Sequence, residues 1–271
     1  LGGSMGEFTD KSGIQFKILN RTKGRSVWSP RAQVDKRVYE KLVRNKITKQ
    51  SIKLIEGEVV NLFVKNNRIH GVVLRTGDII HSHAVIITCG TFLSGIIHIG
   101  GRKALAGRLG EGPSSGLTDA LKSLGFNAGR LKTGTPPRID KKSVLWDKTK
   151  EAFGDLNPVP FSYITKNFSP PNIPCHTVRT NEQCHNIIKN NLEKSPMFTG
   201  DIAGIGPRYC PSIEDKVHRF SHHDSHTLFL EPEWLNSDQI YTNGFSTSLP
   251  EAVQLRALRK IPALKNAVFF R

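Results

Sequence analysis

The stretch SIKLIEGEVVNLFVKNNRIHGVVLRTGDIIHSHAVIIT, residues 51–88, decides the fold class. Its apolar runs are separated by short polar turns, KNNR at 65–68 and GD at 77–78, and this pattern predicts successive strands joined by tight turns. Residues 84–88 are apolar without a break, which is typical of a strand buried on both faces. With a helix expected before it, the stretch indicates an α/β sheet that carries a β-meander.

The segments around this stretch are assigned from periodicity and cap residues. A strand is expected at 14–19 and a helix from Pro30, which suits an early helical position. Further helices are expected at 117–124 with Ser114 or Ser115 as the cap, at 180–192 with Asn181 as the cap, and at 250–259, followed by a strand at 266–270. Residues 141–175 are irregular and spaced by prolines, which predicts a domain boundary.

Composition limits the functional classes. The 271 residues carry a formal net charge of +16, which favours a polyanionic partner such as nucleic acid; a basic protein of a compartment such as the mitochondrion is the alternative. No run of 18 apolar residues is present, so no membrane span is predicted. The chain opens LGGSMGEFTD, without Met at position 1 or a signal-peptide pattern, and we expect an internal piece of a longer protein.

The four cysteines, Cys89, Cys175, Cys184 and Cys210, are too few for a disulfide scaffold in a chain of this length, which favours a reducing compartment. The pairs Cys175-His176 and Cys184-His185 fit no common zinc spacing. The histidines of His222–His226 are expected to be solvated. No metal site is predicted.

The stretch GPRYCPSIEDK, residues 206–216, is the candidate for a chemical role. Arg208 and Lys216 favour the thiolate of Cys210, and Glu214 or Asp215 could pass protons or orient a polar ligand. The alternative is a structural cysteine in a tight turn. The glycine-rich basic loops at 100–116 and 129–138 could present N–H groups and cations to phosphate, although neither contains a Walker A or GxGxxG pattern.

Several long stretches together resemble one family. They are LGGSMGEFTDKSGIQFKILNRTKG, WSPRAQVDKRVY, ITCGTFLSGIIHIG, GRLKTGTPPRID, SPMFTGDIAGIGPRYCPSIEDKVHRF, LFLEPEW and NGFSTSLP, which run from residue 1 to about residue 260 and resemble the MnmG (GidA) family. The resemblance implies a flavoenzyme of tRNA modification. With an MnmE-type GTPase, such enzymes install an aminomethyl-type group on carbon 5 of the wobble uridine, using FAD, NADH and methylene-tetrahydrofolate as the carbon donor.

The resemblance also implies a domain arrangement. Residues 1–138 are expected to form part of a glutathione-reductase-like FAD-binding domain, with the β-meander at about 52–83. Residues 139–250 would form an inserted α/β domain that carries GPRYCPSIEDK, and residues 251–271 would begin the return to the FAD-binding domain. The glycine-rich FAD element of the family is not within these residues, so we expect the chain alone to be inactive and to bind FAD weakly.

The site residues follow by matching motifs. Val59 and Ser114 match FAD-contacting positions, and Cys210, Asp215 and Lys216 match the catalytic segment. The nicotinamide-binding segment matches Gly206, Pro207, Arg208, Tyr209, Cys210, Pro211, Ser212, Ile213, Glu214, Asp215, Lys216, Val217, His218, Arg219 and Phe220. Cys210 would act on or near the base or the flavin adduct.

The expected partners are tRNA, the GTPase and a second copy of the chain in a homodimer. The basic balance and the Asn/Lys-rich spacers favour a mitochondrial version over one from the bacterial cytoplasm. Two other functions stay open. One is a basic RNA-binding module without catalysis, and the other is a flavin- and folate-dependent tRNA uridine methyltransferase.

Overall fold

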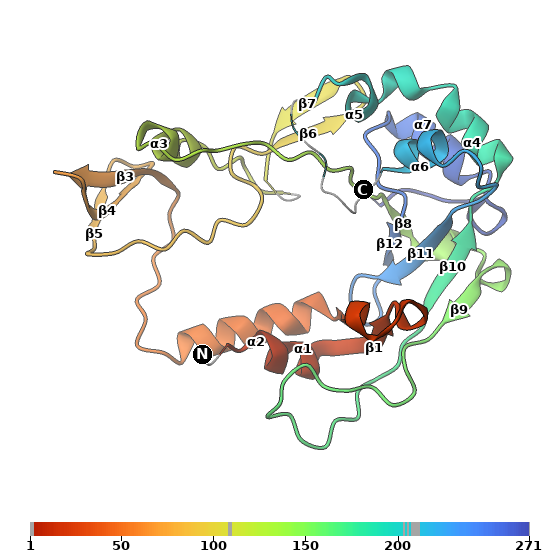
Figure 1. The fold of residues 1–271 in the computed structure, drawn as a ribbon, viewed down its shortest axis with the longest axis horizontal. Coiled ribbons are helices and arrows are strands. Elements are labelled where there is room, and N and C mark those ends of the chain that lie inside the picture. The colour runs from red at the N-terminus through yellow and green to blue at the C-terminus, as the bar shows by residue number, and fades with distance from the viewer. Residues whose placement is uncertain (1–2, 108–109, 203, 205, 207–211, 271) are drawn as a thin grey trace.

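The computed structural model describes residues 3–107, 110–202, 204, 206 and 212–270. Their fold is mixed α/β. Figure 1 shows an open arrangement in which a three-stranded sheet and a five-stranded sheet lie at opposite ends of the long axis, with helix α2 running between them along one side. None of the helices in these residues is long and apolar enough to cross a membrane.

A hairpin and two helices form the N-terminal part. β1 (Gly13–Leu19) pairs antiparallel with β2 (Ser29–Val34). The helix expected from Pro30 is therefore wrong in its first half, because these residues pair with β1 along their backbone. α2 (Lys36–Thr48) begins after Asp35, whose carboxylate accepts the first free N–H groups of the helix. α1 (Met5–Ser12) was not predicted in this glycine-containing segment.

The predicted meander is confirmed. β3 (Val59–Lys65), β4 (Arg68–Leu74) and β5 (Ile79–His81) form an antiparallel sheet in that order. Asn66 and Asn67 turn the chain between β3 and β4 with φ values of 50° and 58°, the left-handed conformation that a two-residue hairpin turn requires.

The apolar run at residues 84–88 differs from the prediction. No described strand pairs with it, and Ile86 is 88% exposed. A strand buried on both faces needs a neighbour at each edge and a layer on each side. The apolar pattern suits a buried strand, but the described residues provide no neighbouring strand that would bury it.

The hydrophobic core lies around the five-stranded sheet, which is antiparallel in the order β8-β12-β11-β10-β9. Alternate residues of its strands, such as Leu228, Leu230 and Ile240, are fully buried against helices on one face. The strands are β8 (Arg138–Asp140), β9 (Lys150–Ala152), β10 (Cys175–Arg179), β11 (Thr227–Pro232) and β12 (Gln239–Asn243), and the covering helices are α4 (Glu182–Lys189), α6 (Ile213–Arg219) and α7 (Glu251–Leu258) (Figure 1).

The remaining helix predictions are largely confirmed. α4 has Asn181 as its cap, with the side chain accepting the N–H of Cys184 at 2.9 Å, and α7 lies within the expected range. α3 (Leu117–Ser123) follows Gly116, so the caps expected at Ser114 or Ser115 are wrong. Residues 266–270 form an isolated bridge to β8 in place of the expected strand. The other elements are β6 (Ile96–Ile99), β7 (Arg102–Leu105) and α5 (Pro196–Thr199).

Ion pairs connect the N-terminal part to the five-stranded sheet. The carboxylate of Glu233, just after β11, binds Lys36 at the start of α2 and the Nε of Arg138 in β8 at 2.8 Å. The guanidinium carbon of Arg37 lies 3.8 Å from the ring centre of Trp234. Glu233 is 7% exposed, so its charge is largely shielded from solvent and its partners hold α2 against the sheet.

Replacing Glu233 by Gln should lower the free energy of unfolding by about 2 kcal/mol at neutral pH, since two ion pairs lose their buried charge. Burial tends to raise the pKa of Glu233, but hydrogen bonds from Lys36 and Arg138 outweigh it, so this pKa is lowered from 4.5. The stabilisation is therefore present above pH 4.5 and lost below it, and the two proteins should become equally stable in acid. Urea unfolding at several pH values measures this difference.

The matched control is Glu193→Gln, because the Glu193 side chain is 65% exposed and pairs with Lys194 at 3.8 Å. This change should alter stability by less than about 0.5 kcal/mol. Equal losses in the two variants would contradict the role assigned to Glu233.

Candidate functional site

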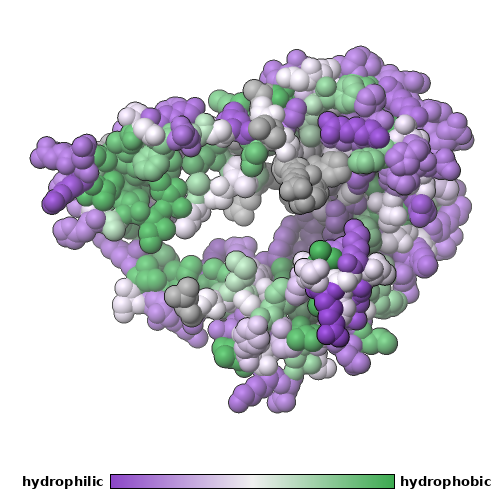
Figure 2. All heavy atoms as spheres, in the orientation of Figure 1, coloured by the Kyte–Doolittle hydropathy of each residue, from purple (hydrophilic) through white to green (hydrophobic). Residues whose placement is uncertain are grey.

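A large cleft opens between the two ends of the molecule, where Figure 2 shows it hollowed. Its volume is about 2550 Å³, and it is lined by α2, β6, β7, α3, residues 128–138 and parts of the 247–254 region. Several of the motifs quoted from the sequence thus meet on one concave surface. A cleft of this size can take a ligand much larger than a single nucleotide.

The start of α6 is fixed by its own capping residues. The side chain of Ser212 accepts the N–H of Asp215 at 3.1 Å, and the Asp215 carboxylate accepts the N–H of Ser212 at 3.3 Å, which together form a capping box. Arg219 pairs with Asp215 at 3.1 Å, one helical turn further on. Lys216 donates from Nζ to the carbonyl of Gly244 at 2.9 Å. Asp215 and Lys216 thus order this segment.

Glu214 ties α6 to two other segments. Its side chain is 1% exposed, and Oε1 accepts hydrogen bonds from Ser195 Oγ and Thr247 Oγ1, both at 2.8 Å, and from the N–H of Ser248 at 3.2 Å. Three donors from two separate segments thus converge on one buried oxygen. The network joins the motifs SPMFTG, SIEDK and FSTSLP.

Backbone segments around α6 approach too closely to admit side chains. A Cβ on Gly134 would lie 2.5 Å from the backbone nitrogen of Thr247, and one on Gly204, whose φ is 129°, would lie 2.6 Å from the carbonyl oxygen of Arg130. The GRLKTGTPPR loop therefore packs directly on both the FSTSLP loop and residue 204.

The predicted nicotinamide segment is described in part. Pro207, Arg208, Tyr209, Cys210 and Pro211 lie outside the described residues. Gly206 is exposed, as are His218, Arg219 and Phe220, whereas Ser212, Ile213, Glu214 and Val217 are buried. The buried side chains hold α6 on the core, which leaves the exposed ones accessible to a ligand.

The two predicted FAD contacts are brought together. Ser114 forms a parallel bridge with Leu93, and a Cβ on Gly116 would lie 2.7 Å from the carbonyl oxygen of Val60, next to Val59. The loop that contains Ser114 therefore lies along β3. In Figure 1, β3 and α6 are at opposite ends, so the structure does not bring this pair of residues to the nicotinamide segment.

An ion pair that the sequence did not indicate fastens this loop. Glu58 binds Arg75 in a bidentate pair, and its Oε1 also accepts the N–H of Ser115 at 3.2 Å. Arg75 in turn donates to Ser115 Oγ at 2.7 Å. The hydrogen bonds from Arg75 and Ser115 lower the pKa of Glu58 to about 2. No sequence spacing could have joined residues so far apart in the chain.

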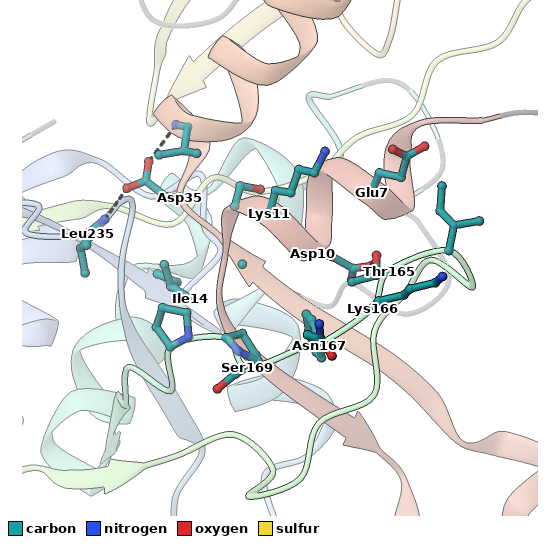
Figure 3. Close-up of a pocket in the computed structure, with 17 residues that line it drawn as sticks. Glu7, Asp10, Lys11, Ile14, Asp35, Thr165, Lys166, Asn167, Ser169 and Leu235 are labelled. Atoms are coloured by element: carbon teal, nitrogen blue, oxygen red, sulfur yellow. Dashed lines mark hydrogen bonds between the residues drawn. The ribbon is translucent and has the colours of Figure 1, made fainter.

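A second pocket, of about 620 Å³, lies beside α1 (Figure 3). Its wall is held by Asp10, whose carboxylate accepts the N–H groups of Phe161 and Ser162 at 2.7 and 3.0 Å and the hydroxyl of Thr165 at 2.6 Å. None of the predicted site residues lines this pocket.

Two of the cysteines are inert. Cys175 and Cys184 are buried, and burial raises the pKa of the first to about 11 and of the second to about 12. Within the residues that the structure describes, no group of three or more His, Cys, Asp and Glu side chains is arranged to hold a metal ion. The rings of His222 and His223 lie 4.2 Å apart at a tilt of 43°. Both side chains are exposed as expected, whereas His226 is half-buried, so the expectation that it is solvated is wrong.

The Glu58 ion pair can be tested by titration. In the Arg75→Gln variant, the Glu58 pKa should rise from about 2 toward its ordinary value of 4.5, because its strongest hydrogen-bond donor is removed. Carbon-detected NMR of the side-chain carboxyl follows it directly. Arg68→Gln, at the other end of the β3–β4 hairpin, serves as the control. A shift of equal size in both variants would refute the pairing.

The Glu214 network can be tested by stability. Glu214→Leu should lower the free energy of unfolding by about 3 kcal/mol, because three buried donors lose their acceptor. Glu214→Gln retains one carbonyl oxygen and should cost less. Glu182→Leu, at an exposed position in the first turn of α4, should leave urea unfolding nearly unchanged. A wild-type midpoint for Glu214→Leu would show that the network does not stabilise the fold.

Comparison with known proteins adds relatives along the whole chain. The family described as GIDA, glucose inhibited division protein A, matches residues 1–271. The tRNA uridine 5-carboxymethylaminomethyl modification enzyme MnmG of Thermodesulfovibrio yellowstonii is 48% identical over 272 residues, which cover 100% of this chain and 44% of that protein. The Chlorobaculum tepidum enzyme of the same name is 46% identical over 274 residues, with the same coverage. These bacterial relatives lend no support to the mitochondrial expectation.

Comparison with solved structures indicates the same family as comparison with sequences. Aquifex aeolicus GidA in its form I crystal superposes with a TM-score of 0.91 at 44% identity, covering 100% of this chain and 46% of that one. The form II crystal gives a TM-score of 0.89 at 41% identity. The chain thus spans less than half the length of these relatives, and the mixed α/β fold is that of the GidA structures. The match across all 271 residues shows that the chain belongs to the glucose inhibited division protein A (GidA, MnmG) family.

Proposed function

We propose that this chain is part of a flavoenzyme that modifies the wobble uridine of tRNA. With a GTPase partner, the complete enzyme installs an aminomethyl-type group on carbon 5, using FAD, NADH and methylene-tetrahydrofolate. The observation that carries the proposal is the family match over the whole chain together with identities of 46–48% to enzymes named for tRNA uridine modification. The net charge of +16 supports an RNA substrate independently.

FAD fits the edge formed by β3 and the loop at residues 110–116. Gly116 brings this loop against the β3 backbone, and the Glu58–Arg75–Ser115 contacts hold it there. Val59 and Ser114 would contact the cofactor at this edge. Bound FAD would supply the redox chemistry, and the protein residues would bind it and exclude water.

Residues 206–220 are proposed to receive the nicotinamide, with Cys210 as the thiol that acts on the base. The fixed start of α6 supports this role, since the capping box and Glu214 hold residues 212–216 rigidly beside the cleft wall. Asp215 and Lys216 would act through this ordering. A homodimer is proposed from the family resemblance alone.

The domain arrangement is also a proposal. Residues 1–138 would belong to a glutathione-reductase-like FAD domain, residues 139–250 to an inserted domain, and residues 251–271 to the return into the FAD domain. The exposure of the apolar run at 84–88 supports it, because a larger sheet in a complete enzyme would cover those side chains.

A chimera tests the proposed function. Residues 1–271 replace the matching part of the Thermodesulfovibrio yellowstonii enzyme, and the purified protein is mixed with the GTPase partner and GTP, FAD, NADH, methylene-tetrahydrofolate, an ammonium salt and unmodified tRNA. We expect a flavin spectrum that bleaches with NADH and an aminomethyl-type adduct found by mass spectrometry of the tRNA. Cys210→Ser should abolish the adduct and retain the flavin, whereas Cys89→Ser should alter neither.

Each other outcome has a definite meaning. A colourless chimera that modifies no tRNA would overturn the flavoenzyme and favour an RNA-binding module. A plain methyl product would assign the chain to uridine methylation. Full activity of the Cys210→Ser chimera would remove the role proposed for the thiol.

A further inference from the structure

A group of basic side chains lies on one wall of the cleft. His98 in β6 and Lys103 in β7 are direct partners across the hairpin, so their side chains project from the same face. Both line the cleft. Arg102, the preceding residue of β7, lies on the opposite face of the hairpin, where it pairs with Glu251 at 3.4 Å in another part of the cleft lining.

Two further cations reach this wall from the GRLKTG loop. Arg130 donates from Nη2 to the carbonyl of Ser94, two residues before β6, at 2.9 Å. Lys132 donates from Nζ to the carbonyl of Met197 at 3.2 Å. Each hydrogen bond anchors one side chain and leaves other N–H groups of the same guanidinium or ammonium group to bind a ligand. Both residues line the same cleft as His98 and Lys103.

A serine holds the two parts of the wall together. The N–H of Gly100, at the turn of the β6–β7 hairpin, donates to the carbonyl of Ser248 at 2.8 Å. The hydroxyl of Ser248 accepts the N–H of Met197 at 3.0 Å, so the residue that anchors Lys132 is fixed to the same serine. The basic groups therefore sit on a prearranged surface, which lowers the entropic cost of binding.

His98 carries a buried polar atom without a partner. Its Nδ1 is shielded from solvent and makes no hydrogen bond within the described part of the chain. Burial lowers the pKa of His98, Lys103 and Arg130 lower it further, and the Asp201 carboxylate opposes them. An unpaired buried nitrogen among cations is unfavourable, and an anion would relieve both the desolvation and the repulsion.

We propose that His98, Lys103, Arg130 and Lys132 form a phosphate-binding site in the cleft wall. Its ligand is a phosphate group, whose oxygens accept charge-assisted hydrogen bonds from the three cations and a hydrogen bond from an imidazole N–H. The group belongs either to an RNA backbone or to the pyrophosphate of a dinucleotide. The RNA source rests on the proposed function, whereas the site itself does not.

Binding to the full chain tests the site with three probes: a fluorescein-labelled anticodon stem-loop RNA, inorganic pyrophosphate and NADH, at about 0.1 M salt. Lys103→Gln and Arg130→Gln should each lower the affinity for the probe that occupies the site by about tenfold, because each removes one charge-assisted hydrogen bond. The matched control, Arg256→Gln, removes the same charge from an exposed position in the last turn of α7, outside the lining of the cleft, and should change affinity less than about twofold. Circular dichroism confirms that each variant is folded.

The pH dependence provides a second readout. A bound phosphate favours the imidazolium of His98, so binding takes up a proton and affinity should rise as the pH falls below 6.5. Lys103, Arg130 and Asp201 are the charged groups that act on His98, and all three are retained in His98→Gln. The variant should therefore lose this pH dependence while retaining the effect of the cations.

Equal affinities for wild type, Lys103→Gln, Arg130→Gln and Arg256→Gln would overturn the site, as would an unchanged pH dependence in His98→Gln. Competition between the probes separates the sources. Displacement of the RNA by pyrophosphate supports the backbone phosphate, and displacement of NADH alone supports the dinucleotide. The chimera that makes no tRNA product would refute the proposed function without affecting this binding pattern.

Discussion

The carboxylate of Glu233 is the contact on which the arrangement of the molecule depends. It binds Lys36, at the first turn of α2, and Arg138, at the first residue of β8. α2 is one wall of the cleft, and the loop that leads into Arg138 is another. One partly buried charge therefore sets the distance between the two walls, and the stacking of Arg37 on Trp234 fixes their orientation.

Local chemistry decided which elements could be predicted. The meander follows from the two asparagines that accept positive φ between β3 and β4, and α4 follows from the amide of Asn181. The start of α2 was predicted too early because proline is compatible both with the first turn of a helix and with an edge strand, and Pro30 fits either. Pairing with β1 decides between the two, and that partner lies outside any local window.

The candidate site shows the same division. Sequence motifs located the segment at 206–220, but the side chains that hold it come from elsewhere. The hydroxyls of Ser195 and Thr247 carry no signal of their own, since serine and threonine are common in loops, and only the fold brings them to Glu214. The sequence indicated the basic loops as candidate phosphate binders. It did not indicate His98, which becomes a candidate only because the fold places it opposite Lys103 on the neighbouring strand.

The burial of Cys175 and Cys184 has a practical consequence. With pKa values of about 11 and about 12, their thiolates are nearly absent at neutral pH. Reagents reach Cys184 only when the five-stranded sheet and its helices separate, and they reach Cys175 only when the β1–β2 hairpin leaves the sheet. Cys89, in contrast, is exposed. The alkylation rates of the two buried cysteines, followed by mass, therefore measure two different openings of the native protein: Cys184 reports the opening of the core, and Cys175 reports the detachment of the hairpin.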